Sequence, residues 1–132
     1  RSLMGRINQI RRSNPALSHN LVTFHPTSNE MLLCYSKREP PDAGDNTVLV
    51  VANMDVHNPQ SGWVELDLPE LLGLAPSGAG GEAVQLHDLL SDSRYFSEGR
   101  RLYVRLEPSS APAHVFRLRR RARTEQDFDY FV

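Results

Sequence analysis

The sequence is poor in cysteine: it holds one, Cys34, in 132 residues. A single thiol excludes a disulfide-stapled scaffold and a zinc site built from cysteines. Cys34 lies in the apolar run MLLCYS, where no basic neighbour would lower its pKa, so we expect a small buried side chain and not a reactive thiol. A chain of this length buries roughly two-thirds of its unfolded surface and needs neither metal nor disulfide to form a core.

Net charge and long apolar runs are also nearly absent. Fifteen basic and sixteen acidic side chains leave a formal charge of -1, which gives the domain no electrostatic reason to bind nucleic acid or anionic lipid. No stretch approaches the roughly 18 apolar residues of a membrane-spanning helix, and the start RSLMGRINQI lacks the apolar run of a signal peptide. We expect a soluble, cytoplasmic protein with no membrane or nucleic-acid partner.

What the chain does have is one amphipathic helix at its start. Residues 2–13, SLMGRINQIRRS, carry apolar side chains at helical spacing, and Pro15 ends the pattern because the residue before a proline is pushed out of the helical region. The apolar side chains are Leu3, Met4, Ile7 and Ile10. No second helix of similar strength follows as a partner, so the segment resembles the last piece of something larger.

From residue 20 onward the apolar period changes to two, and turn residues interrupt the chain at regular intervals. This pattern predicts an all-β fold, an antiparallel β-sandwich of about eight strands. The run TVLVVAN is apolar throughout and predicts a central strand, whereas RLYVRLE alternates and predicts a strand with one wet face. A turn of helix is expected in PELLGL. We expect strands at 21–25, 31–37, 47–53, 62–68, 83–89, 94–97, 101–107 and 113–119.

Residues that could carry catalysis or bind metal are scattered. The five histidines, at positions 19, 25, 57, 87 and 114, fall in separate elements without the close pairs that build zinc sites. Glycoside chemistry needs two carboxyl groups roughly 5 to 10 Å apart in a cleft, and a small sandwich with short loops offers no obvious one. GAGG, residues 78–81, lacks the six-position glycine pattern and predicts a flexible loop. We predict no metal site and no cofactor.

The basic run RLRRRAR, residues 117–123, is the remaining charged feature. A nucleic-acid patch is the less favoured interpretation, because no aromatic side chain interleaves the arginines and acidic residues follow at once. A solvated strand end or an ion-pair surface between domains is favoured. The aromatic side chains Phe128, Tyr130 and Phe131 predict that the tail docks on another surface.

The segment NMDVHNPQSGWVELDL, residues 53–68, gathers two Asp, a Glu, a His and a Trp. The turn residues Asn58-Pro59 and Ser61-Gly62 separate two apolar runs, so we predict a β-hairpin with a wide loop that holds Asp55 and His57. If Val64, Leu66 and Leu68 face the core, then Trp63, Glu65 and Asp67 face outward.

An outward Trp63 has two interpretations that the sequence leaves open. It packs on a neighbouring domain or subunit, which we favour because aromatic residues more often fill interfaces, or it offers a flat platform to a sugar ring. Trp63 is the one candidate substrate-binding residue in the chain.

Several segments, taken in order, resemble the C-terminal part of the alpha-amylase superfamily. They are RINQIRRSNPAL, LLCYSK, NTVLVVANMD, GWVELDLP, LHDLLSDSRYFSEGRRLYVRLEP and PAHVFRLR. The chain is most similar to the bacterial maltosyltransferases of that superfamily, which use maltose 1-phosphate and alpha-1,4-glucan. Trehalose synthases and glycogen branching enzymes share the layout and remain alternatives, as does an independent glycan-binding module.

The resemblance implies that a catalytic (β/α)8 barrel lies upstream and that residues 1–14 are its last helix. Residues 15–119 would then be the C-terminal β-sandwich, and residues 120–132 a charged and aromatic tail. The family's catalytic carboxylates fall before residue 1, so no catalytic residue is assigned here and the chain alone is expected to be inactive. The implied partners are the barrel, the two substrates through the parent enzyme, and a second copy of that enzyme in a homodimer.

Overall fold

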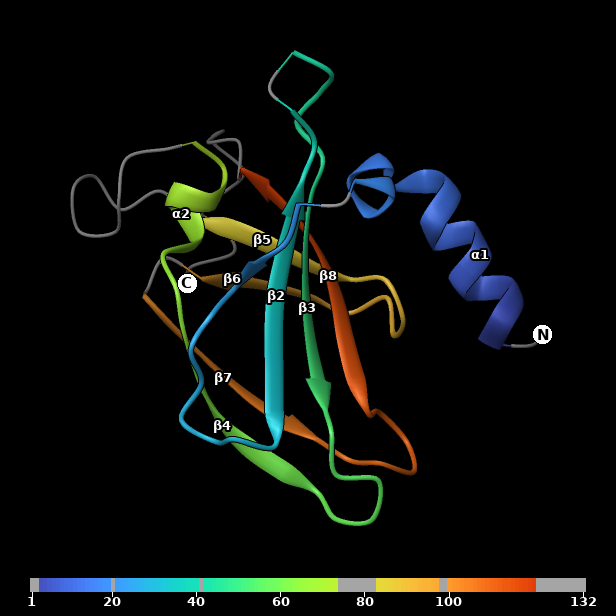
Figure 1. Ribbon diagram of the computed structural model, residues 1–132, viewed down its shortest axis with the longest axis vertical. Helices are drawn as coiled ribbons and strands as arrows, with labels where there is room; N and C mark the ends of the chain where they lie inside the picture. Colours follow the sequence, from blue (N-terminus) through green and yellow to red (C-terminus); the bar gives the residue numbers. More distant parts are fainter. Residues whose placement is uncertain (1–2, 20, 41, 74–82, 98–99, 121–132) are drawn as a thin grey trace, which may run out of the picture.

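The computed structural model describes residues 3–19, 21–40, 42–73, 83–97 and 100–120. In these parts of the chain, two α-helices and one 3-10 helix accompany eight strands (Figure 1). The helical elements are α1 (Leu3–Ser13), η1 (Pro15–Ser18) and α2 (Leu68–Leu71). The strands are β1 (Thr23–Phe24), β2 (Leu32–Arg38), β3 (Thr47–Asn53), β4 (Gln60–Glu65), β5 (Val84–Asp88), β6 (Arg94–Ser97), β7 (Arg101–Leu106) and β8 (Ala113–Arg120).

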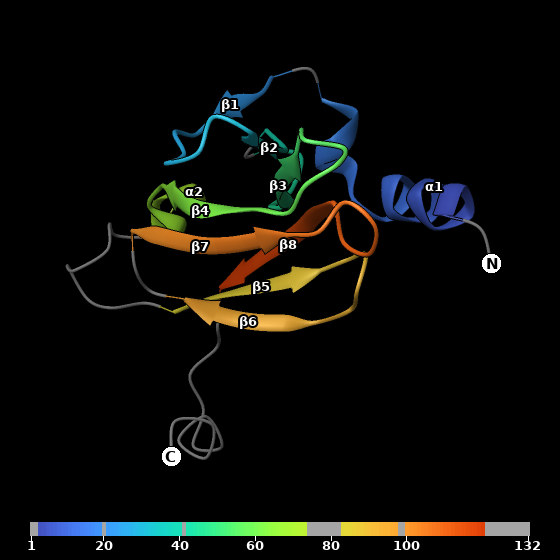
Figure 2. The ribbon, with the colours of Figure 1, turned by 90° about the horizontal axis from the view of Figure 1, so that it is seen from below.

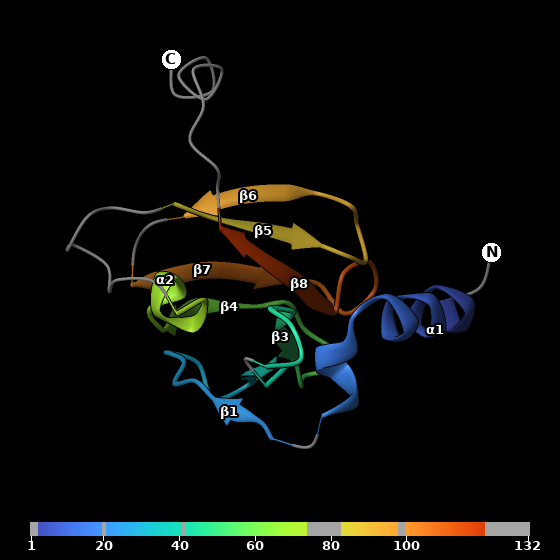
Figure 3. The same ribbon diagram turned by 90° about the horizontal axis from the view of Figure 1, so that it is seen from above.

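The strands form two antiparallel sheets. One has six strands in the order β1-β2-β3-β8-β5-β6, and the other pairs β4 with β7. The smaller sheet packs against one face of the larger, which curves around it in the views of Figures 2 and 3. The prediction of an eight-stranded antiparallel sandwich preceded by one helix is confirmed.

Alternate side chains of both sheets meet in one core, as period-two apolar patterns require. Cys34 is 1% exposed within this core, so the predicted buried side chain is confirmed, and burial raises the pKa of its thiol to about 12. The core consists of Leu32, Cys34, Leu49, Val51, Val64, Leu66, Leu68, Val84, Leu86, Val104, Leu106, Phe116 and Leu118.

The two strands whose environment was predicted behave as expected. β3 lies between β2 and β8, with Val48 and Leu49 fully buried, so the continuous apolar run is a central strand. β7 alternates, because Val104 and Leu106 point into the core while Tyr103 remains 53% exposed.

The predicted hairpin over residues 53–68 is wrong. β3 pairs with β2 and β8 in the large sheet, whereas β4 pairs with β7 in the small one, so the connection is an arch between sheets. The carboxylate of Asp55 folds this arch by accepting hydrogen bonds from the backbone N–H groups of His57 (2.9 Å) and Asn58 (3.1 Å) and from the Gln60 amide (2.9 Å). These bonds lower the pKa of Asp55 to about 2.

The end of the predicted strand 62–68 also differs. β4 stops at Glu65, and Asp67 caps α2 by accepting a hydrogen bond from the Glu70 N–H at 3.1 Å. The Asp67 side chain is only 7% exposed and does not lie on the outward face with Trp63. The expected helical turn in PELLGL is present as α2, while the GAGG loop and the aromatic tail lie outside the described residues.

Candidate functional site

The outward face of the small sheet holds the predicted candidate residue. Trp63 of β4 lies directly opposite Tyr103 of β7, and their rings meet edge to face with centroids 5.2 Å apart at an interplanar angle of 65°. Trp63 is 39% exposed, so the expectation that it faces outward is confirmed. We call this surface the β4–β7 outer face; its cross-strand pairs are Ser61 with Arg105, Trp63 with Tyr103, and Glu65 with Arg101.

Charged side chains flank the aromatic pair on both sides. The Nε of Arg101 lies 3.0 Å from a Glu65 carboxylate oxygen, and its guanidinium carbon lies 4.5 Å from the centre of the Trp63 ring. At the other end of the pair, Arg105 donates to Glu107 at 3.4 Å. The face therefore combines two aromatic rings with two ion pairs, and in each pair the positive and negative charges cancel.

The backbone of Trp63 is held from the second edge of β4. Its N–H donates to the Ser28 hydroxyl and its carbonyl accepts from the Ser28 N–H, both at 2.9 Å. This close approach requires the neighbouring glycine, because a Cβ on Gly62 would lie 2.8 Å from the Ser28 hydroxyl oxygen. Gly62 is thus an interior strand residue that admits a neighbouring segment, and not the turn residue that the sequence indicated.

A second candidate surface lies on the opposite side of the sandwich. A groove of about 900 Å³, lined mainly by apolar side chains together with Arg6, Arg11, Lys37 and Asp88, opens between α1 and the outward face of the large sheet. Ile7 and Ile10 of α1 line one wall, and Tyr35, Val50 and Val115 of the sheet form another. We call this the α1 groove. The large sheet therefore has a second apolar face in addition to the one that forms the core.

Buried polar contacts tie the segment that follows α1 to the sandwich. Asn46, before β3, donates through its side-chain amide to the Asn14 side chain at 3.0 Å and accepts from the Ala16 N–H at 2.9 Å. Asn14 and Asn46 are 2% and 4% exposed, so these hydrogen bonds are shielded from water. At the other end of the helix, Arg6 donates to the Leu90 carbonyl at 2.7 Å.

One buried carboxylate organises the turn that Arg6 contacts. Asp88, 2% exposed, accepts hydrogen bonds from the His114 Nδ1–H (2.8 Å), the Ser91 hydroxyl (3.0 Å) and the Leu90 N–H (3.1 Å). Burial raises the pKa of Asp88, but these hydrogen bonds outweigh it, led by the one from His114, and the pKa lies below its ordinary value. Asp, His and Ser together resemble a catalytic group in composition. Here, however, the oxygens of the Asp88 carboxylate accept hydrogen bonds that join β5 to β8 and to the turn.

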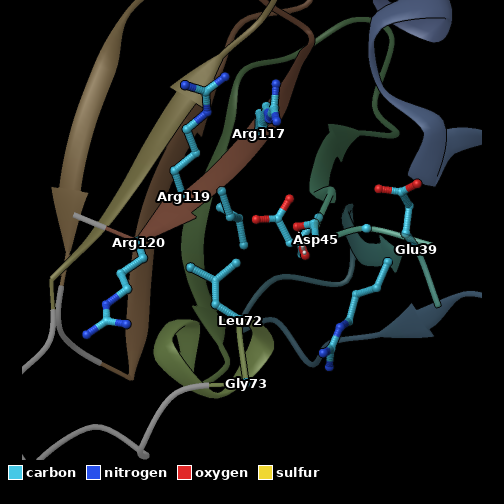
Figure 4. Close-up of a pocket in the computed structure, with 11 residues that line it drawn as sticks. Glu39, Asp45, Leu72, Gly73, Arg117, Arg119 and Arg120 are labelled. Atoms are coloured by element: carbon cyan, nitrogen blue, oxygen red, sulfur yellow. Dashed lines mark hydrogen bonds between the residues drawn. The ribbon is translucent and has the colours of Figure 1, made fainter. Parts of the chain in front are cut away.

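The third surface holds residues 117–120 of the predicted arginine run, whose residues 121–123 lie outside the described part of the chain. Figure 4 shows Arg117, Arg119 and Arg120 of β8 along one side of a pocket of about 780 Å³, with Asp45 and Glu39 on the other. Burial and the charge of Arg119 lower the pKa of Arg117, while Asp45 and Glu39 oppose that shift. The pocket therefore has opposite charges on its two sides, and the ion-pair surface that the sequence favoured over nucleic-acid binding stays a prediction.

The histidines stay apart in the structure. His25 hydrogen-bonds the Ser36 hydroxyl at 2.8 Å, and burial lowers its pKa; His87 donates to Asp92 at 2.7 Å; His114 donates to Asp88. Within the described ranges, three or more potential ligands nowhere gather into a metal-binding group. No helix in that same part of the chain is long and apolar enough to span a membrane.

These features define an antiparallel β-sandwich domain that carries an amphipathic N-terminal helix. Comparison with known families gives the particular family: residues 24–118 match the model described as "GLGE, C-terminal". The chain belongs to this family, as the resemblance in its sequence predicted.

Similar proteins are maltosyltransferases of much greater length. The chain is 48% identical over 120 residues to alpha-1,4-glucan:maltose-1-phosphate maltosyltransferase 2 of Streptomyces coelicolor, a match that covers 89% of this chain and 16% of that protein. It is 39% identical over 124 residues to the maltosyltransferase of Salinibacter ruber, covering 93% and 17%. It is 35% identical over 132 residues to that of Myxococcus xanthus, covering 99% and 19%. The chain thus spans less than a fifth of these relatives.

Sequence reasoning found Trp63 but missed what surrounds it and the buried polar groups. The pairing of Trp63 with Tyr103 depends on which strands meet in the small sheet, a long-range property. Asp88 carried a usable signal, because it shares its parity in β5 with the apolar Val84 and Leu86 and therefore had to point into the core.

Proposed function

We propose that this chain is the supporting C-terminal domain of a larger enzyme that transfers maltosyl groups from maltose 1-phosphate to alpha-1,4-glucan. In this proposal the catalytic barrel and its carboxylates lie outside residues 1–132, and α1 is the last helix of that barrel. The family match and the relatives' names support the parent enzyme. The supporting role rests on one structural observation, the open α1 groove.

The α1 groove has the properties of a surface that receives another apolar surface. Ile7 and Ile10 are only partly buried although they face the sheet, and Val50 and Val115 across the groove are partly buried as well. Apolar side chains gathered in one groove indicate a contact site with another part of the protein or a partner. The Asn14–Asn46 contact ties the segment that follows α1 to the sandwich, so the groove is a preformed seat for the barrel.

The proposed reaction of the parent enzyme is a double displacement. A carboxylate of the barrel attacks the anomeric carbon of maltose 1-phosphate as phosphate leaves, and the acceptor hydroxyl of the glucan completes the second displacement with retention of configuration. No cofactor is proposed. Localisation in the cytoplasm and assembly into a homodimer belong to the same proposal.

The relatives favour the maltosyltransferase over the alternative parents. The three described above are all named as maltosyltransferases, whereas a trehalose synthase or a glycogen branching enzyme would rest on the shared layout alone. An independent glycan-binding module without a barrel would leave the apolar side chains of the α1 groove without a partner.

Phosphate release from maltose 1-phosphate tests the proposal. The 132-residue chain alone should release none, and the protein that includes the sequence encoded upstream should release phosphate only when alpha-1,4-glucan is present. Release by the 132-residue chain alone would overturn the proposal.

The seat itself is tested by placing a charge in the α1 groove of that longer protein. Ile10→Asp should sharply lower its thermal stability, because a carboxylate would be buried against apolar surface. Gln9→Asp puts the same charge at an exposed position of the same helix and is the matched control. Equal effects of the two substitutions would show that α1 is not covered.

A further inference from the structure

We propose that the β4–β7 outer face binds a chain of alpha-1,4-linked glucose, with Trp63 and Tyr103 as the stacking platform. The inference rests on the proposed function for the identity of its ligand, since the relatives act on alpha-1,4-glucan by name. It adds a binding site to a domain whose proposed role is otherwise support.

The shape and chemistry of the face fit a sugar chain. A pyranose ring presents C–H groups on its faces and hydroxyls around its rim, so it binds where aromatic rings lie beside polar side chains. The Trp63 and Tyr103 rings are tilted by 65° with centroids 5.2 Å apart, and both are partly exposed. Alpha-1,4 linkages turn each glucose relative to the next, so two tilted rings follow such a chain better than a flat beta-1,4-linked one.

The charges of the face fit a neutral ligand that is rich in hydroxyl groups. Arg101 is paired with Glu65, and Arg105 with Glu107, so each guanidinium has a carboxylate of opposite charge beside it. This balance removes the positive excess that a phosphate or nucleic acid would require. All four side chains are at least partly exposed, and they can donate to or accept from sugar hydroxyls.

The platform is held in place before any ligand binds. Ser28 fixes the N–H and the carbonyl of Trp63 on one edge of β4, and Tyr103 lies across the ladder on the other. The Arg101 guanidinium restrains the indole ring further. Binding therefore orders few side chains, which lowers its entropic cost.

The position of the face leaves it open in the proposed parent enzyme. Trp63 and Tyr103 point away from the core on the small sheet, whereas the α1 groove lies on the outward side of the large sheet, so the two surfaces are on opposite sides of the sandwich. Figures 1 and 3 show β4 and β7 on the side of the domain away from α1. A barrel seated in the α1 groove would not cover the platform.

A protein partner is the competing occupant, because Trp, Tyr and Arg also recur in protein interfaces. A stable interface takes about 20 to 30 residues from each side. The face presents six cross-strand side chains, which matches a short oligosaccharide better than a second protein surface.

Trp63 is the only tryptophan in the chain, so its fluorescence reports on this site alone. We expect maltoheptaose to change the emission of the 132-residue chain in a saturable way and cellohexaose to leave it unchanged. No response to maltoheptaose, or an equal response to the two sugars, would overturn the inference.

Variants distinguish binding at the Trp63–Tyr103 platform from nonspecific binding of glycogen to the chain. Retardation of the chain in native gels that contain glycogen should weaken by about tenfold or more for Trp63→Ala and for Tyr103→Ala, as expected for central aromatic contacts. Phe24→Ala, which removes a more exposed ring from β1, should leave retardation unchanged. Thermal unfolding checks that each variant folds, and full retardation of folded Trp63→Ala would contradict the inference.

The protein-interface alternative gives a different result. Light scattering would then show a dimer that forms as the concentration rises, is lost in Trp63→Ala and is unaffected by maltoheptaose. This result would assign the face to a second copy of the chain and overturn glucan binding. The phosphate-release test of the parent enzyme does not depend on this outcome, so the two proposals can fail separately.

Discussion

The outward faces of the two sheets differ in the side chains that they carry. The large sheet presents Tyr35, Val50 and Val115 to α1, a mainly apolar surface with Lys37 beside it, and Arg6, Arg11 and Asp88 also line the groove. The small sheet presents Trp63 and Tyr103 between two ion pairs. The first is the chemistry of a surface that is covered permanently, and the second that of a surface meeting water and a polar ligand.

The largest effect is expected where the α1 side of the domain is anchored. Asp88→Ala should lower the free energy of unfolding by about 3 kcal/mol, because it removes a buried acceptor and leaves the donors of His114, Ser91 and Leu90 without their shared partner. Urea denaturation measures this loss. Asp92→Asn in the same turn is the control: Asp92 is 78% exposed and its removal should cost far less. Equal losses would contradict the role given to Asp88.

A smaller effect is expected at the junction of α1 with the sandwich. Asn46→Ala should cost about 2 kcal/mol, since it removes a buried amide that bonds to Asn14 and Ala16. Asp45→Ala, at the exposed neighbouring position, should change stability by less than about 0.5 kcal/mol. Hydrogen exchange should also show faster opening of η1 in Asn46→Ala. A variant as stable as Asp45→Ala would mean that α1 is not fixed by this contact.

The smallest effect is expected in the pH dependence of the free energy of unfolding, and it comes from Asp88 on the α1 side of the domain. The pKa of Asp88 is lowered in the folded state, so its stabilisation is present above the unfolded value of about 4 and is lost as pH falls through the lower folded value. The stability difference between the wild type and Asp88→Asn should therefore shrink below about pH 4. Denaturation at a series of pH values measures it. A difference that grows as pH falls would have the wrong sign.

The elements of the fold were predictable because each follows from local periodicity. The helix over 2–13 and the eight strands came from apolar spacing, and Trp63 was placed outward by parity with Val64. The arch was mistaken for a hairpin because the turn residues around Asn58-Pro59 are compatible with both. Whether β4 joins β3 or β7 depends on long-range core contacts that no local pattern contains.

The candidate surfaces were predictable only in part, for the same reason. An outward Trp63 can be read from one strand, but its edge-to-face contact with Tyr103 and the Arg101 guanidinium over its ring require the β4–β7 register. The amphipathic pattern of residues 2–13 predicted that the helix would need an apolar partner surface. The groove beside it depends on how α1 lies against the large sheet, which no local sequence pattern contains.

Hydrogen exchange of α1, compared between the 132-residue chain and the longer protein that contains it, tests the central claim most directly. The account predicts that the amides of Leu3–Ser13 exchange much more slowly in the longer protein, while those around Trp63 and Tyr103 exchange alike in both. Exchange of α1 that is equally fast in the two proteins, with β4 and β7 protected in the longer one, would contradict it.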